Sequence, residues 1–141
     1  LAVALALSSI ANLLGRQQLY DKAMVLLEET LRIRLLHLGP DHEDVAAILF
    51  AIGVAFDKRM EYTSAMMAYT DALRIRKMRF GDKSIEVAET LTNIGIVKGN
   101  DSDLQGAIET WEEALEILVD LGCDENHPLI GILAGHREVA K

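Results

Sequence analysis

The chain has 141 residues, half of them apolar, and a formal net charge of −8. This length suits one domain or one piece of a repeat array. Phosphate binding needs a net basic footprint, so the acidic balance argues against nucleic acid as the main partner. Because Cys123 is the only cysteine, an intrachain disulfide and a cysteine-cluster zinc site are excluded. A lone cysteine fits a reducing compartment, and we expect an intracellular, cytoplasmic protein.

The first segment, residues 1–14 (LAVALALSSIANLL), is apolar but lacks the features of a targeting or membrane-spanning segment. No positive charge precedes it, Asn12 and two serines interrupt it, and it is too short to cross a bilayer. We therefore expect neither a signal peptide nor membrane insertion. The segment has no polar helix cap and the chain does not start with Met. We expect a fragment or a processed product, in which further repeats or a partner cover this first helix.

The sequence repeats with a period of 42 residues. The motif LRIR occurs at residues 31–34 and again at 73–76. The same offset aligns columns of like residues: Val3, Val45 and Val87; Ile10, Ile52 and Ile94; Ala23, Ala65 and Ala107; Leu31, Leu73 and Leu115. Such self-similarity indicates one array of structural repeats. The predicted units are residues 3–44, 45–86 and 87–128, followed by a partial, capping helix within 129–141.

Each unit is predicted to hold two helices, because its apolar residues recur every three or four positions. The first helices of the units, called A helices, are expected at residues 3–14, 45–58 and 87–98. The second, or B, helices are expected at residues 19–38, 62–80 and 104–121, and a last helix at 129–140. Only two prolines and many Ala and Leu residues agree with this. The predicted fold class is all-α.

Glycines and polar residues mark the helix ends. The B helices are each followed by a glycine, where a left-handed residue costs least: Gly39, Gly81 and Gly122. Ser102 and Gln105 are spaced as a capping box that starts the third B helix.

One repeat column holds only small residues, Ala11, Gly53 and Gly95, in the middle of the A helices. Glycine there costs about 1 kcal/mol relative to alanine. The sequence tolerates this cost, so we expect helix B to approach helix A closely at this column.

Formal charge differs between the units: the second carries +2 and the third −9. We expect the arginines of LRIR on the outward face of helix B. Arg74 is then predicted to pair with Glu113 or Glu116 of the next unit, and Glu28 with Arg32 in the same helix. The alternative is that the acidic third unit recruits a basic partner.

No catalytic, cofactor-binding or metal-binding motif is present, so we predict neither an enzyme nor a cofactor or metal site. His42 and His127 fall in matching inter-repeat loops, which favours helix capping or packing over metal binding. Cys123 precedes two acidic residues, which disfavour a reactive thiolate. The acidic run from Glu109 to Asp120 has the spacing of a solvated helix face.

At the repeat columns the sequence resembles the tetratricopeptide repeat. In the second unit, the family's pattern falls on Leu49, Ile52, Gly53, Phe56, Ala65, Tyr69 and Ala72. The 42-residue period and the loop motifs LGPDHEDVA and NHPLI are similar to kinesin-light-chain-type repeats. The resemblance implies a right-handed superhelical solenoid of three helical hairpins plus a C-terminal helix. It also implies a non-catalytic protein–protein interaction scaffold or adaptor, with a protein or peptide as its partner.

The resemblance further implies a concave groove, lined by the A helices, that binds a peptide or helix. Its expected residues are Asn12, Arg16, Phe50, Val54, Lys58, Thr92, Asn93 and Ile96. Phe50 and Val54 are a facing apolar pair for a partner's hydrophobic side chain. Asn12 and Asn93 carry amides that suit an extended peptide backbone, although Asn93 could instead satisfy a neighbouring helix end. The alternative function is a structural subunit that uses the array ends or the convex face.

Overall fold

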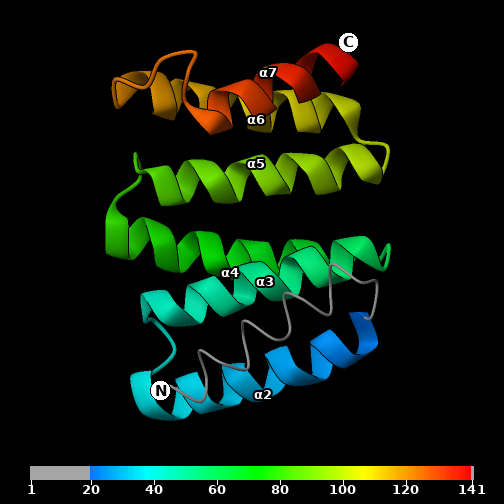
Figure 1. Ribbon diagram of the computed structural model, residues 1–141, viewed down its shortest axis with the longest axis vertical. Coiled ribbons are helices and arrows are strands. Elements are labelled where there is room, and N and C mark those ends of the chain that lie inside the picture. Colours follow the sequence, from blue (N-terminus) through cyan, green and yellow to red (C-terminus); the bar gives the residue numbers. More distant parts are fainter. Residues whose placement is uncertain (1–19, 141) are drawn as a thin grey trace. The chain divides into compact units, whose positions relative to one another are not determined.

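The computed structural model describes residues 20–140, with side chains described as far as His136. Within this range every regular element is an α-helix (Figure 1). The helices are α2 (Tyr20–Leu38), α3 (Glu43–Lys58), α4 (Tyr62–Phe80), α5 (Ile85–Asn100), α6 (Leu104–Asp120) and α7 (Pro128–Ala140). The helix predicted at residues 3–14 lies outside the described residues.

The helix boundaries agree closely with the 42-residue repeat. The second B helix, α4, has the predicted bounds residue for residue, and α2, α6 and α7 differ from prediction by one residue at one end. The A helix α5 ends two residues later than predicted, and both α3 and α5 begin two residues earlier than predicted. They do so because His42 and Ser84 act as N-caps, so the turn before the first apolar residue is already helical.

The chain forms two compact units, residues 1–75 and 76–141, and the division falls within α4. In the first unit, α2 packs against α3, and the first part of α4 contributes to the same core. In the second unit, α5 packs along α6, and α7 contacts both. Each unit therefore has helix-on-helix packing around its own apolar residues.

An aromatic ring of helix B lies directly against a glycine of helix A in both described hairpins. A methyl group placed on Gly53 would lie 2.6 Å from Cε1 of Tyr69. One placed on Gly95 would overlap the indole ring of Trp111. The Trp111 indole N–H donates a hydrogen bond of 3.1 Å to the carbonyl of Thr92. The predicted close approach at the small-residue column is confirmed for these two positions, and Ala11 lies outside the described residues.

Side chains in the inter-repeat loops cap the A helices. His42 Nδ1 accepts a hydrogen bond from the Asp44 N–H at 3.0 Å, and Ser84 Oγ accepts one from Val87 at 3.3 Å. His127 Nδ1 accepts from Leu129 at 3.2 Å, near the start of α7. The predicted capping role of His42 and His127 is thereby confirmed.

The B helices end at left-handed glycines as predicted, with φ of 84°, 94° and 84° at Gly39, Gly81 and Gly122. The predicted capping box at Ser102 is wrong. The N-cap of α6 is Asp103, whose carboxylate accepts from the Gly106 N–H at 3.0 Å. Ser102 has a φ of 68° and belongs to the turn that ends α5, so its side chain is not placed to cap α6.

The second arginine of each LRIR motif is buried, which corrects the prediction that these arginines face outward. Arg34 and Arg76 are 3% and 9% exposed. Each donates to a backbone carbonyl in the first turn of the next A helix: Arg34 to Asp44 at 2.7 Å and Arg76 to Glu86 at 3.4 Å. Each guanidinium therefore fastens the end of a B helix to the start of the following A helix.

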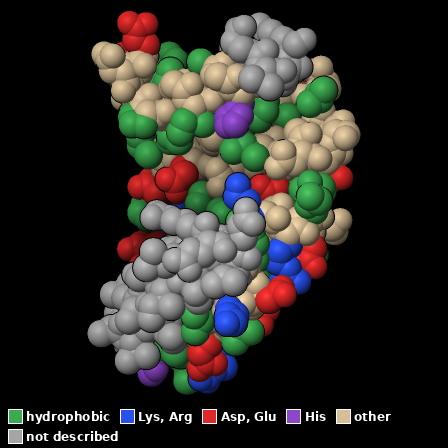
Figure 2. Space-filling view, turned by 45° about the vertical axis from the view of Figure 1, so that its right-hand side comes forward, with side chains coloured by type: hydrophobic (Ala, Val, Ile, Leu, Met, Phe, Trp, Pro, Cys, Tyr) green, Lys and Arg blue, Asp and Glu red, His purple; other side chains and the backbone are tan. Residues whose placement is uncertain are grey.

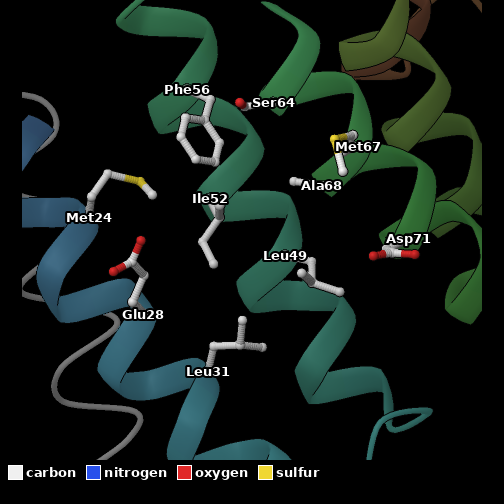
Figure 3. Close-up of a pocket in the computed structure, with 10 residues that line it drawn as sticks. All are labelled: Met24, Glu28, Leu31, Leu49, Ile52, Phe56, Ser64, Met67, Ala68 and Asp71. Carbon is white, nitrogen blue, oxygen red and sulfur yellow. The ribbon is translucent and has the colours of Figure 1, made fainter. Parts of the chain in front are cut away.

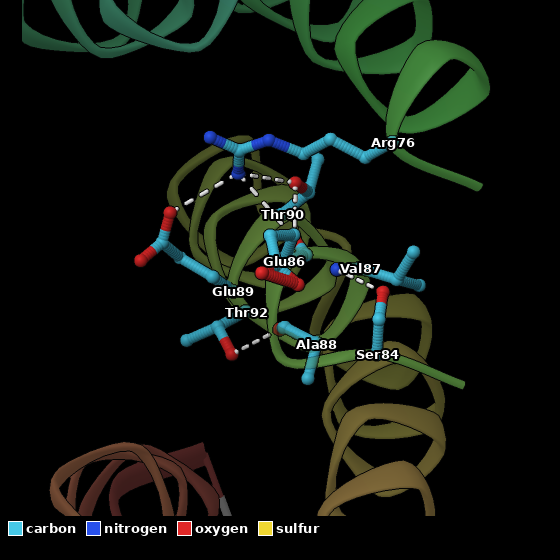
Figure 4. A network of polar contacts seen from close by, with 8 residues as sticks. All are labelled: Arg76, Ser84, Glu86, Val87, Ala88, Glu89, Thr90 and Thr92. Carbon is cyan, nitrogen blue, oxygen red and sulfur yellow. Dashed lines mark hydrogen bonds and ion pairs between the residues drawn. The ribbon is translucent and has the colours of Figure 1, made fainter. Parts of the chain in front are cut away.

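The Arg76 guanidinium makes two further contacts, to Thr90 Oγ1 at 2.9 Å and to Glu89 Oε1 at 3.1 Å (Figure 4). Thr90 in turn donates its hydroxyl hydrogen to the Glu86 carbonyl at 2.8 Å. A buried charge is tolerated when it is paired and hydrogen-bonded, and the planar fork of arginine can serve several acceptors at once.

The surface ion pairs also differ from those predicted. Arg74 pairs with Asp41 at 3.0 Å rather than with Glu113 or Glu116. Lys83 pairs with Asp120 at 2.7 Å, and this hydrogen bond raises the pKa of Lys83. Both pairs join an inter-repeat loop to the next B helix along the chain. In the first pair the loop carries the acidic residue and the helix the basic one, whereas in the second pair the loop carries the basic residue.

Within α2 the partner of Arg32 is Glu29, three residues before it, and not Glu28 as predicted. The hydrogen bond between them lowers the pKa of Glu29. On the face that Figure 2 shows, Lys and Arg side chains lie among Asp and Glu side chains.

The aromatic–glycine contact predicts opposite effects for two glycines of α5. Gly95→Ala should lower the free energy of unfolding by about 1–3 kcal/mol, because overpacking against Trp111 outweighs the gain in helix propensity. Gly99→Ala should leave it unchanged or raise it by up to about 1 kcal/mol, because its nearest neighbours would lie 3.8 Å away. Urea unfolding followed by circular dichroism measures both. A Gly95→Ala variant as stable as the wild type would contradict the contact.

The burial of Arg76 predicts a contrast with Arg74, two residues earlier in the same helix. Arg76→Ala should cost about 1–3 kcal/mol of stability, because three hydrogen bonds are lost and a void is left. Arg74→Ala should cost no more than about 1 kcal/mol, because its pair with Asp41 is half exposed. Equal losses in chemical unfolding would show that the buried guanidinium has no special role.

Candidate functional site

One side of α3 carries the groove residues predicted for the second unit. Ala47, Phe50, Val54 and Lys58 follow one another at spacings of three and four, which places them on one helix face. Ala47 and Lys58 are exposed, whereas Phe50 and Val54 are half-buried. We call these four residues the α3 face. The structure therefore brings the predicted residues Phe50, Val54 and Lys58 together.

Phe50 belongs both to the α3 face and to the interior. Its ring lies edge-on to that of Tyr69, with centroids 5.5 Å apart and an interplanar angle of 63°. It also packs against a buried cluster that includes Ala46, Ala72 and Ile75. The ring is thus held in place before any partner arrives.

The predicted groove residues of α5 differ in how far their side chains are exposed. Asn93 and Ile96 are half-buried and lie three residues apart on the helix. Thr92 is only 2% exposed, and its hydroxyl donates to the Ala88 carbonyl at 2.8 Å. Its side chain offers no surface to a partner, so Thr92 does not fit the predicted role. Asn12 and Arg16 lie outside the described residues.

A pocket that the sequence did not predict lies in the first unit, between α2, α3 and α4. It has a volume of about 320 Å³. Its lining residues are Met24, Glu28, Leu31, Leu49, Ile52, Phe56, Ser64, Met67, Ala68 and Asp71. The only sequence signal was that Glu28, Met67 and Asp71 are polar or flexible residues on B helices that otherwise show a regular apolar pattern. That pattern does not reveal a hollow.

The other groups considered from the sequence are the histidines, Cys123 and the acidic residues of α6. Among the described side chains, no three of His, Cys, Asp and Glu come together in a way that could hold a metal ion. Cys123 is half-buried, and Glu109, Glu112, Glu113 and Glu116 are exposed on α6. In the described part of the chain, no helix is both long and apolar enough to cross a bilayer.

The sequence model of the tetratricopeptide repeat family matches residues 2–78, which is more than half of the chain. No curated protein matches the chain.

Several solved structures share its fold. BtubC (BKLC) from P. vanneervenii is 23% identical, with a TM-score of 0.78 over 97% of this chain. The nearly identical TPR-like repeats assigned to a Podosopora anserina kinesin light chain are 15% identical, with a TM-score of 0.84 over 96%. The N-terminal domain of STI-1 from C. elegans is 14% identical, with a TM-score of 0.66 over 96% of this chain and 94% of that domain. The chain spans 58% of the BtubC chain and 64% of the Podosopora chain.

The double role of Phe50 predicts that truncating it affects stability as well as binding. Phe50→Ala should lower the free energy of unfolding by about 1–3 kcal/mol, because the contact with Tyr69 and part of the core packing are lost. Ala47→Arg, on the same face, should change it by no more than about 0.5 kcal/mol, because Ala47 is exposed. Thermal or urea unfolding would show this contrast, and a fully stable Phe50→Ala variant would contradict it.

Proposed function

Because the chain belongs to the tetratricopeptide repeat family, we propose that it is a non-catalytic scaffold or adaptor that binds a protein partner through its A helices. Its fold is the all-α helical-hairpin fold of that family, and its 42-residue repeats are of the kinesin-light-chain type. Tetratricopeptide repeats are protein-interaction modules, since stacked hairpins expose extended surfaces for a partner. The finer question is which surface the partner contacts.

The observation that carries the proposal is the α3 face. Phe50 is partly accessible and is fixed in place by Tyr69. An aromatic residue that is already ordered loses little conformational entropy on binding, and such residues are frequent energetic centres of interfaces. Val54 extends the apolar surface by one helical turn, and exposed Lys58 supplies a charged edge. This arrangement suits an apolar side chain of a partner peptide or helix.

The proposed contact residues of α5, in the second unit, are Asn93 and Ile96, and we consider them apart from the α3 face. Asn93 carries an amide that can donate to and accept from a peptide backbone, and Ile96 adds apolar surface three residues later. With Thr92 buried, the proposed contact residues are Phe50, Val54 and Lys58 in the first unit and, separately, Asn93 and Ile96 in the second. The occupant is a protein or peptide segment, and its identity is the object of the experiment.

Blocking the α3 face without disturbing the core tests this function. Ala47→Arg adds a long charged side chain beside Phe50, and we expect at least a tenfold drop in partner capture, equivalent to about 1.4 kcal/mol. Affinity capture with the tagged full chain, read by quantitative mass spectrometry, measures it. The matched control is Thr70→Arg, which adds the same side chain at an exposed position of α4.

The proposal requires one set of proteins that the wild type and Thr70→Arg capture and that Ala47→Arg loses. Identical sets for all three proteins would rule out the α3 face as the contact surface. Circular dichroism spectra of the variants should coincide, which confines the difference to binding.

A further inference from the structure

The pocket between α2, α3 and α4, here called the α2–α4 pocket, has an apolar floor and an acidic rim (Figure 3). Met24, Ile52 and Ala68 are 5%, 5% and 7% exposed, so they belong to the floor. Glu28 and Asp71 are exposed, and they lie on α2 and α4, on opposite sides of α3. The volume of about 320 Å³ is at the lower end of the range for ligand pockets.

The charge at the rim has one sign. Among the lining residues there are two carboxylates and no Lys or Arg. Neither Glu28 nor Asp71 takes part in an ion pair among residues 20–136. A carboxylate that makes no ion pair attracts a positively charged group and disfavours an anionic one. Fatty acids, phosphates and acidic peptides are therefore poor occupants.

Methionines give the pocket an adaptable wall. Met24 lies at the floor, and Met67 lines the opposite side with 69% of its surface exposed. Methionine is unbranched and polarizable, so it can adjust to apolar groups of different shape. The exposed side chain of Met67 is therefore accessible to an apolar group that enters the pocket.

We propose that the α2–α4 pocket binds a basic amphipathic segment of a partner protein, whose apolar side chain enters the pocket while Lys or Arg residues beside it pair with Glu28 and Asp71. A second copy of this chain is disfavoured because both copies carry a net charge of −8. A basic helix satisfies the floor and the rim together, since residues three or four apart on it can present apolar and cationic groups side by side.

This site is separate from the α3 face of the proposed function. The pocket residues of α3 are Leu49, Ile52 and Phe56, whereas the α3 face carries Ala47, Phe50, Val54 and Lys58. At about 100° per residue, the two sets point to opposite sides of the helix. One helix thus separates two surfaces, and each can be blocked without the other.

Methionine methyl groups provide the readout. The full chain, labelled with ¹³C at the methionine methyls, is titrated with a model amphipathic helix made of Leu and Lys. We expect the signals of Met24 and Met67 to shift, while those of Met60 and Met78, which do not line the pocket, stay in place. The matched Leu and Glu peptide should bind at least tenfold more weakly, because its charges repel the rim.

Two double variants distinguish an effect of the rim carboxylates from a general effect of the protein's negative charge. Glu28→Gln with Asp71→Asn should weaken binding of the Leu and Lys peptide about three- to tenfold, and the loss should shrink at high salt. Glu112→Gln with Glu113→Gln removes the same charge from exposed positions of α6 and should leave binding unchanged. Ala47→Arg should also leave it unchanged, so this result is independent of the proposed function.

Several outcomes would overturn the proposal. Equal shifts at all methionines, or equal effects of the two double variants, would indicate a nonspecific attraction to acidic surface. Equal binding of the Leu and Glu peptide would indicate an apolar surface without charge selectivity. Shifts of Met24 and Met67 that grow with protein concentration, without peptide, would identify a second copy as the occupant.

Discussion

In the two hairpins α3–α4 and α5–α6, the spacing of the two helices depends on one contact, an aromatic ring of helix B against a glycine of helix A. Tyr69 occupies the space above Gly53, and Trp111 occupies that above Gly95. A side chain at either glycine would push the helices apart. The same approach allows the Trp111 indole to reach a backbone carbonyl of α5 and sets Tyr69 against Phe50. The position of the Phe50 ring on the α3 face therefore depends on Gly53, although glycine by itself is unfavourable inside a helix.

A second constraint acts between hairpins, at the column of Arg34, Arg76 and Leu118. The two arginines tie a B helix to the next A helix through its backbone, whereas Leu118 is fully buried and apolar. A guanidinium donates directed hydrogen bonds, and a leucine only fills space. The first turns of α3 and α5 therefore each accept a directed hydrogen bond from a buried arginine, whereas the start of α7 depends on apolar contact and on the His127 cap.

The sequence was sufficient for the helices and the hairpin contact, because both follow from local spacing and from the small-residue column. It was insufficient for the arginines, since a charged residue is normally assigned to the surface. Leu118 in the same repeat column was the available signal that the position is interior. Thr92 was misplaced for a similar reason, since threonine is normally assigned to the surface, whereas this side chain is 2% exposed and donates to the Ala88 carbonyl of its own helix. The pocket could not be foreseen, since its walls come from three helices and its depth depends on how they pack.

Comparison of the two described hairpins indicates why the apolar pocket belongs to α3 and α4. One repeat later, Phe56 and Ala68 are replaced by Lys98 and Thr110. The Lys98 ammonium donates to Thr110 Oγ1 at 3.0 Å, so a polar bridge joins α5 to α6 where α3 and α4 present an aromatic ring and a methyl group. Such a bridge satisfies its own polar atoms and places polar groups at the two positions that are apolar in the pocket. The differences at these two repeat columns therefore make the α3–α4 hairpin chemically different from the α5–α6 hairpin, although both have the same helical repeat.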